Sequence, residues 1–156
     1  MDESSKGLTL GAFLEPEGRD APLMCVRVPA RAELVSAARA IAGLTLKAHG
    51  VAPAVVVAAE LIVSEVATNV VFHNKWDLDP VIVLIMSKAG SVLRIEAVDS
   101  EPAIPKIREL TADSESGRGL QIVQAVSDRW GVDLIPPDGK VVWCELVAWP
   151  DETDQR

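Results

Sequence analysis

The sequence predicts an α/β fold, a two-layer sandwich in which three helices cover one face of a mixed sheet. Three segments show the apolar spacing of helices, and five are strand-like, being rich in β-branched residues or alternating apolar with polar residues. The elements follow the order β-α-α-β-β-α-β-β, which suits helices packed on a sheet. With 156 residues, 49% of them apolar and 24% charged, the chain can bury the core of one soluble domain.

Each expected element has a local reason. Pro29 ends the first strand, and Gly50 suits a left-handed cap after the first helix. Pro53 favours the first turn of the second helix. A short turn at 89–91 joins two strands as a hairpin. The elements are expected at residues 23–28, 32–48, 53–73, 81–87, 92–99, 118–129, 130–135 and 140–148.

One domain over residues 23–148 follows from this order, with a flexible arm at 1–22 and a polar tail at 149–156. The net charge of −8 and the scattered Lys and Arg residues argue against a nucleic-acid ligand. The acidic N-terminus is not a signal peptide, and the longest apolar stretch, residues 51–63, is too short to span a bilayer. We therefore expect a soluble, cytoplasmic protein that does not bind a membrane.

Two cysteines, Cys25 and Cys144, lie far apart in the sequence and form no metal-binding pattern. We expect two reduced thiols, and a disulfide would require their two strands to be neighbours. Trp130 and Trp143 are expected in the core.

The second helix carries polar groups on one side of an otherwise apolar segment. Glu65, Asn69 and His73 are spaced four residues apart and therefore line up along one helix face. A carboxylate can orient a hydroxyl group and take its proton, and a carboxamide oxygen suits Mg²⁺. The same residues could instead form a solvated helix face, with His73 packing or capping the helix end.

Two further segments carry groups suited to nucleotide binding. Asp99 ends a strand, where its carboxylate can accept a hydrogen bond from an exocyclic amine or simply terminate the strand in a turn. In SGRGLQIV (residues 116–123), Gly117 and Gly119 lead into an amphipathic helix, whose first-turn amides and dipole favour phosphate. Gly-x-Gly alone is a weak signal.

Together these segments resemble the motifs of the histidine-kinase-like ATPase superfamily. SEVATN followed by a histidine resembles its N box, VDSEPAIP the adenine-contacting box, and SGRGLQIV the second glycine box. SEVATN, GRGLQIVQAVSDRWGV and VVWCEL are also similar to the anti-sigma factor serine/threonine kinase group, especially small actinobacterial ATP-binding regulatory proteins. The similarity covers about residues 23–147 and implies a Bergerat-type ATP-binding fold.

The resemblance implies ATP and Mg²⁺ as cofactors and a role for each matching residue. Glu65 matches the catalytic carboxylate, Asn69 the Mg²⁺ ligand and Asp99 the acceptor for the adenine amine. The implied cofactor-binding residues are Asn69, Asp99, Gly117, Arg118, Gly119 and Leu120.

The implied function is an ATP-dependent serine/threonine protein kinase that phosphorylates an anti-anti-sigma (STAS-type) protein and regulates transcription by partner switching. A sigma factor is a candidate second partner, and a homodimer is a candidate assembly. The adenine box departs from the family pattern, because residues 99–103 contain no glycine and Pro102 stiffens the loop. This departure favours the alternative of a nucleotide-binding or nucleotide-free regulatory module without kinase activity, and a small ATP hydrolase is a third reading. Residues 105–116 are expected to form a lid.

Overall fold

The computed structural model describes residues 22–73, 80–99, 115–135 and 139–151. The expected N-terminal arm up to residue 21, almost all of the expected lid, and the tail from residue 152 lie outside the described residues. The elements are β1 (Met24–Pro29), α2 (Ala32–Ala48), α3 (Pro53–His73), β2 (Val81–Ala89), β3 (Val92–Asp99), α4 (Glu115–Val126), β4 (Arg129–Leu134) and β5 (Lys140–Val147).

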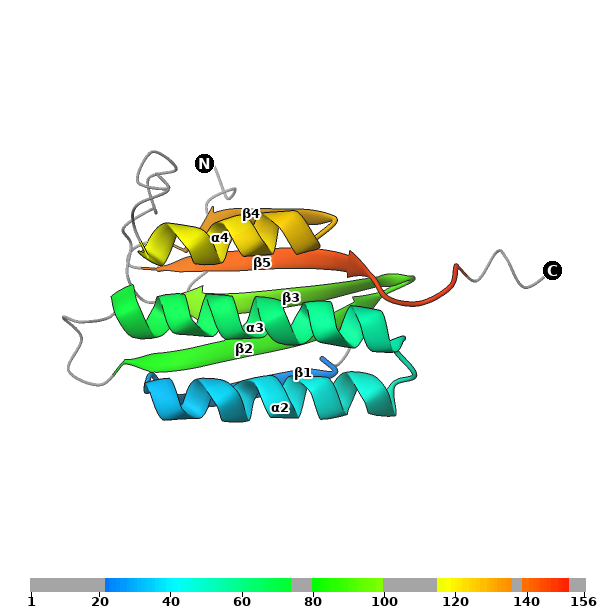
Figure 1. Cartoon of the computed structure of the whole chain (residues 1–156), viewed down its shortest axis with the longest axis horizontal. Coiled ribbons are helices and arrows are strands. Elements are labelled where there is room, and N and C mark those ends of the chain that lie inside the picture. The colour runs from blue at the N-terminus through cyan, green and yellow to red at the C-terminus, as the bar shows by residue number, and fades with distance from the viewer. Residues whose placement is uncertain (1–21, 74–79, 100–114, 136–138, 152–156) are drawn as a thin grey trace, which may run out of the picture.

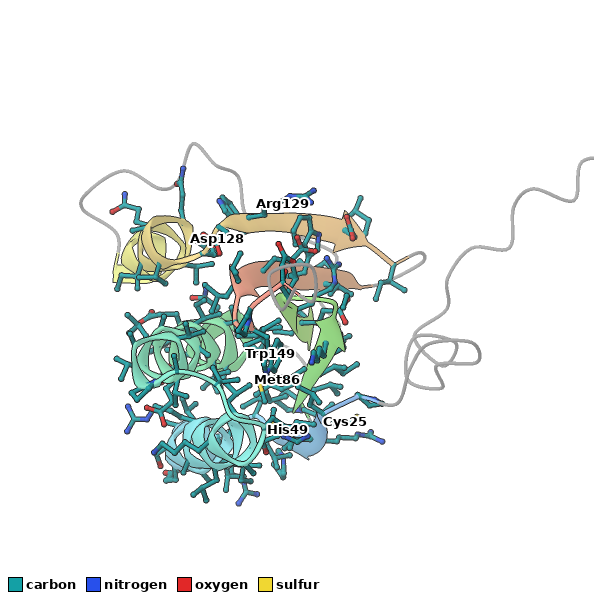
Figure 2. The ribbon with its side chains drawn as sticks, turned by 90° about the vertical axis from the view of Figure 1, so that its right-hand side faces the viewer. Cys25, His49, Met86, Asp128, Arg129 and Trp149 are labelled. Carbon is teal, nitrogen blue, oxygen red and sulfur yellow. The ribbon has the colours of Figure 1, made fainter. Side chains whose placement is uncertain are left out.

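The α/β fold is confirmed as an open five-stranded sheet with three helices on one face. The strands lie in the order β1-β2-β3-β5-β4. In Figure 1, α2, α3 and α4 lie side by side over the sheet, and Figure 2 shows the helices and the strands as two separate layers. The main core lies between these layers and includes the buried side chains of Leu46, Ile62, Leu84 and Ile95.

One detail differs from the expectation of a mixed sheet, because all four described strand pairings are antiparallel. Two helices, α2 and α3, connect β1 to β2, so the chain crosses the sheet twice and β2 returns antiparallel to β1. The single helix α4 brings β4 back in the direction of β3. However, β5 lies between β3 and β4 and runs opposite to both, so no parallel pair is formed.

Local signals placed most element boundaries well. The bounds of α2, α3 and β3 are those expected, and Gly50 has the left-handed φ of 72° predicted for the cap after α2. In contrast, α4 begins at Glu115, three residues earlier than expected.

Helix α3 is the most apolar of the three described helices. By length and composition, Pro53–Phe72 could cross a membrane, with a mean hydropathy of 1.9. In the fold, however, α3 is the central helix of the layer, and its buried side chains Ile62, Val63, Val66 and Val70 belong to the main core. Packing therefore accounts for the buried side of α3, whereas Val57 and Phe72 on the same helix are exposed.

The expectation that Trp143 lies in the main core is wrong, because it lies on the face of the sheet opposite the three described helices. Trp130 packs against the main core, but Trp143 packs against a separate cluster with Val83, Val98 and Val141. Side chains alternate along β5, so Trp143 points away from the face that carries Cys144. On this outer face the Arg94 guanidinium lies 4.5 Å from the centroid of the Trp143 ring.

Both cysteines are free thiols, as expected. Cys25 is exposed and lies opposite Ile85 on the helix-free face, whereas Cys144 is buried in the core opposite Ile95. They therefore point to opposite faces of the sheet and cannot form a bridge. Burial raises the pKa of the Cys144 thiol to about 12, against a small lowering by the charge of Arg94.

Candidate functional site

Helices α3 and α4 approach each other closely at Gly119. A Cβ atom built on Gly119 would lie 2.7 Å from Oε2 of Glu65 and 3.5 Å from Oδ1 of Asn69. Any larger residue would push against these two polar side chains, so glycine permits the close approach. Glu65 and Asn69 are therefore half-buried against α4. His73 is the last residue of α3, and its side chain lies outside the described part.

Asn69 also connects this contact to a small cavity between the two layers. The cavity holds about 10 Å³, room for about one water molecule. Asp99 from β3, Leu120 from α4 and Lys140 from β5 contribute to its wall. Its full lining is Val66, Asn69, Val70, Ala97, Asp99, Leu120, Lys140 and Val142. Three segments distant in sequence, which carry Asn69, Asp99 and Leu120, thus meet at one place.

A buried ion pair forms the sheet side of this cavity. Asp99 and Lys140 are directly opposite each other across β3 and β5, and Nζ of Lys140 lies 3.5 Å from Oδ2 of Asp99. Their side chains are only 4% and 2% exposed. Burial of a charged side chain is unfavourable unless an opposite charge or hydrogen bonds compensate, so each charge supports the other.

Lys140 is the site residue that sequence reasoning missed. It was expected only as the first residue of the last strand. The sequence shows only a lysine directly before the apolar residues VVWC, and lysine is rarely buried, so this position gave little signal. Its pairing with Asp99 depends on β5 lying beside β3, which local patterns do not reveal.

The glycine segment is arranged differently from the expected loop. Because α4 begins at Glu115, Gly117, Arg118 and Gly119 all lie within the helix. The i to i−4 pattern provides intrahelical acceptors for the amides of Gly119 and Leu120. The amides left for an anion are therefore those nearest the start of the helix, not those extending to Leu120.

Comparison with known proteins agrees with this architecture. A family model described as histidine kinase-like ATPase domain matches residues 28–145, which is most of the chain. The chain belongs to this family. This ATPase-family domain is also 30% identical over 95 residues to an uncharacterized protein of Streptomyces coelicolor, an overlap that covers 60% of this chain and 89% of that protein.

As a member of the family, the chain is an ATP-binding domain, and its residues have the chemistry to hold ATP. Asp99 offers a carboxylate acceptor at the sheet, Asn69 offers a carboxamide oxygen, and Glu65 places a carboxylate one helical turn from Asn69. A purine ring is far larger than the cavity at Asp99, since ligand pockets are typically about 300–1,000 Å³. Side chains around that cavity must therefore move before a base can enter.

Proposed function

We propose that this chain is an ATP-binding, anti-sigma factor-like serine/threonine protein kinase. In the cytoplasm it phosphorylates an anti-anti-sigma (STAS-type) protein, and it regulates transcription by partner switching with a sigma factor. The observation that supports this proposal is the meeting of Glu65 and Asn69 with Gly119, and of Asn69 with Asp99. These are the side chains that such a reaction requires, and they lie on one side of the sheet.

Each residue has a distinct task in this proposal. ATP would supply the phosphoryl group, and a bound Mg²⁺ ion would neutralise the charge that develops on it. Asn69 holds the metal through its carboxamide oxygen, and Asp99 accepts a hydrogen bond from the adenine amine. Glu65 orients the Ser or Thr hydroxyl of the partner protein and takes its proton. Most of the rate enhancement then comes from positioning and charge neutralisation.

The test is phosphate transfer to a partner captured from the native host by pull-down. We expect Glu65→Gln to lower the transfer rate by about a hundredfold or more, within the range of general-base contributions, with little change in ATP affinity. Glu60→Gln is the matched control, because Glu60 lies on the same helix but against Gly43 of α2, away from the cavity. A Glu65→Gln protein that transfers phosphate as fast as the wild type would remove Glu65 from this role.

The small cavity favours a second candidate, a regulatory interaction module without kinase activity. In this form, the space beside Asp99 and Lys140 holds little more than a water molecule. Titration with a fluorescent ATP analogue, with and without Mg²⁺, separates the candidates. Binding without transfer supports the module, absence of binding supports a nucleotide-free interaction protein, and phosphate release without a partner indicates a hydrolase.

A further inference from the structure

We propose that the apolar run LTLGAFL (residues 8–14) docks on the outer face of the sheet, the face opposite the three described helices, and adds a third layer to the domain. This inference goes beyond the proposed function, because it depends neither on ATP binding nor on phosphate transfer. The docking surface is the apolar cluster of that face: Val83, Ile85, Val98, Val141 and Trp143.

A row of valines crosses the outer face and is buried although no described helix covers it. Strand register places Val83, Val98 and Val141 side by side on β2, β3 and β5. All three described helices lie on the other side of the sheet (Figure 2). Nevertheless, these valines are only 4%, 3% and 1% exposed. Side chains stand roughly perpendicular to a sheet, so neighbouring strands shield their flanks and not their ends. We therefore infer that another segment covers the ends.

Two other residues of the same face support this reading. Val147 and Val141 lie on one face of β5, because alternate residues of a strand point the same way, yet Val147 is 59% exposed and Val141 is 1% exposed. Glu96 lies between Ile85 and Trp143 on neighbouring strands and is ion-paired with Arg94, and its side chain is only 2% exposed. Glutamate is rarely buried, so its position also indicates a covered surface.

The cover belongs to the same chain, because these exposed fractions are those of one chain without a partner. Among the segments outside the described residues, 152–156 (ETDQR) contains no apolar residue. Residues 74–79 and 136–138 are short connections with both ends attached to described elements.

The remaining internal segment, residues 100–114, is attached on the helix side of the sheet. It follows Asp99, which lines the cavity beneath the helices, and it leads into α4 in the helix layer. Residues 8–14 instead combine leucine and phenylalanine side chains in one run without a charge, and burying them is favourable. Of these segments, the run therefore suits the outer face best.

Chain length and charge both permit this docking. Residues 15–23 separate the run from β1 and reach roughly 30 Å when extended, at about 3.3 Å per residue. The order β1-β2-β3-β5 requires crossing only three strand spacings of about 4.8 Å each. Glu15 and Glu17 follow the run, and Arg27 is exposed on β1 opposite Val83, so opposite charges meet at the edge of the surface.

The surface of the helix layer differs from the outer face of the sheet. Leu44 on α2 is 67% exposed, and Val57 and Phe72 on α3 are 64% and 57% exposed. These apolar side chains are open to solvent, whereas those of the outer face are not. The helix surface therefore provides matched control positions.

The experiment measures thiol labelling by iodoacetamide in the full chain, with Cys25→Ser in every protein. Val83→Cys places a thiol on the docking surface. We expect the double change Leu10→Asp and Phe13→Asp to raise the labelling rate at position 83 by about tenfold or more, because a charged run would leave the face and open it to the reagent. Cys144 is buried in the main core, so its lack of labelling shows that the fold is intact.

Two controls separate undocking from general effects of the substitutions. Ile41→Asp with Leu44→Asp places the same two charges on the exposed helix surface and should leave labelling at position 83 unchanged. A thiol introduced by Val57→Cys on exposed α3 should react equally fast with and without the two changes in the run.

A second measurement keeps the apolar residues of the run in place. A nitroxide attached through Thr9→Cys, again with Cys25→Ser, should broaden the methyl NMR signals of Val83 and Val98 but not those of Val57. This measurement decides the matter if Cys144 becomes labelled in the double aspartate variant, which would show that this variant unfolds.

An equal labelling rate at position 83 with and without the aspartates, in folded protein, would overturn the inference. Undisturbed signals of Val83 and Val98 beside the nitroxide would overturn it too. Broadening that arises only between different molecules, in a mixture of spin-labelled and isotope-labelled chains, would assign the run to a second copy and would also overturn docking within one chain.

Discussion

The buried pair of Asp99 and Lys140 makes a quantitative prediction about stability. Two unit charges 3.5 Å apart attract each other by about 5 kcal/mol at an effective dielectric constant of about 20. Removing one partner of a buried pair typically costs about 3–5 kcal/mol, because the other charge stays buried and loses this opposite charge. We therefore expect Lys140→Met and Asp99→Asn each to lower the free energy of unfolding by about 3–5 kcal/mol. For a chain of this length, that corresponds to a decrease in Tm of roughly 6–20 °C.

The double variant separates the pair from the individual side chains. With both charges removed, we expect a loss of no more than about 2 kcal/mol, so the coupling in a double-mutant cycle should be at least about 4 kcal/mol. Urea unfolding followed by circular dichroism provides the measurement. Arg129→Met is the matched control, since Arg129 and Glu145 are also 3.5 Å apart but Arg129 is 74% exposed. That change should cost at most about 1 kcal/mol. A loss in Lys140→Met no larger than in Arg129→Met would refute burial of the pair and the reasoning built on it.

Four further predictions concern the α3–α4 contact, the metal and the two thiols. Gly119→Ala should leave the fold intact, because the new methyl group would meet the end of the flexible Glu65 side chain. It should nevertheless displace Glu65 and lower the rate of phosphate transfer by about tenfold or more. The transfer rate and a melting curve measure the two effects. Chelation of Mg²⁺ should weaken ATP binding in the wild type but have much less effect in Asn69→Ala, measured by titration with and without EDTA. Iodoacetamide should label Cys25 alone in the folded protein and Cys144 only after unfolding, counted by mass spectrometry. Because the pKa of Cys144 rises from 9.0 to about 12 on folding, the unfolded state binds fewer protons between these values, and the free energy of unfolding should fall as pH rises above about 9.

Much of the fold could be predicted because its signals are local. The apolar period of 32–48 and 53–73, the cap at Gly50 and the alternation in 92–99 each act within a few residues, and all three elements have the expected bounds. The shared helix face of Glu65 and Asn69 follows from helix geometry in the same way. Trp143 shows the limit of this reasoning. An alternating pattern indicates that neighbouring side chains on a strand point to opposite faces of the sheet, but it does not indicate which face the helices cover.

The residues of the candidate site could likewise be predicted from local patterns, but their arrangement in space could not. The sequence alone predicted Glu65, Asn69, Asp99 and the Gly117–Gly119 segment as site residues, because each lies in a recognisable local motif. Their meeting, and the addition of Lys140 to them, required β5 to lie between β3 and β4 and α4 to pack against α3. Such neighbours are selected by the burial of whole faces and by strand register, which are properties of long-range packing. That is why a lysine that local patterns assign only to the start of a strand forms, in the folded protein, part of the wall beside Asp99.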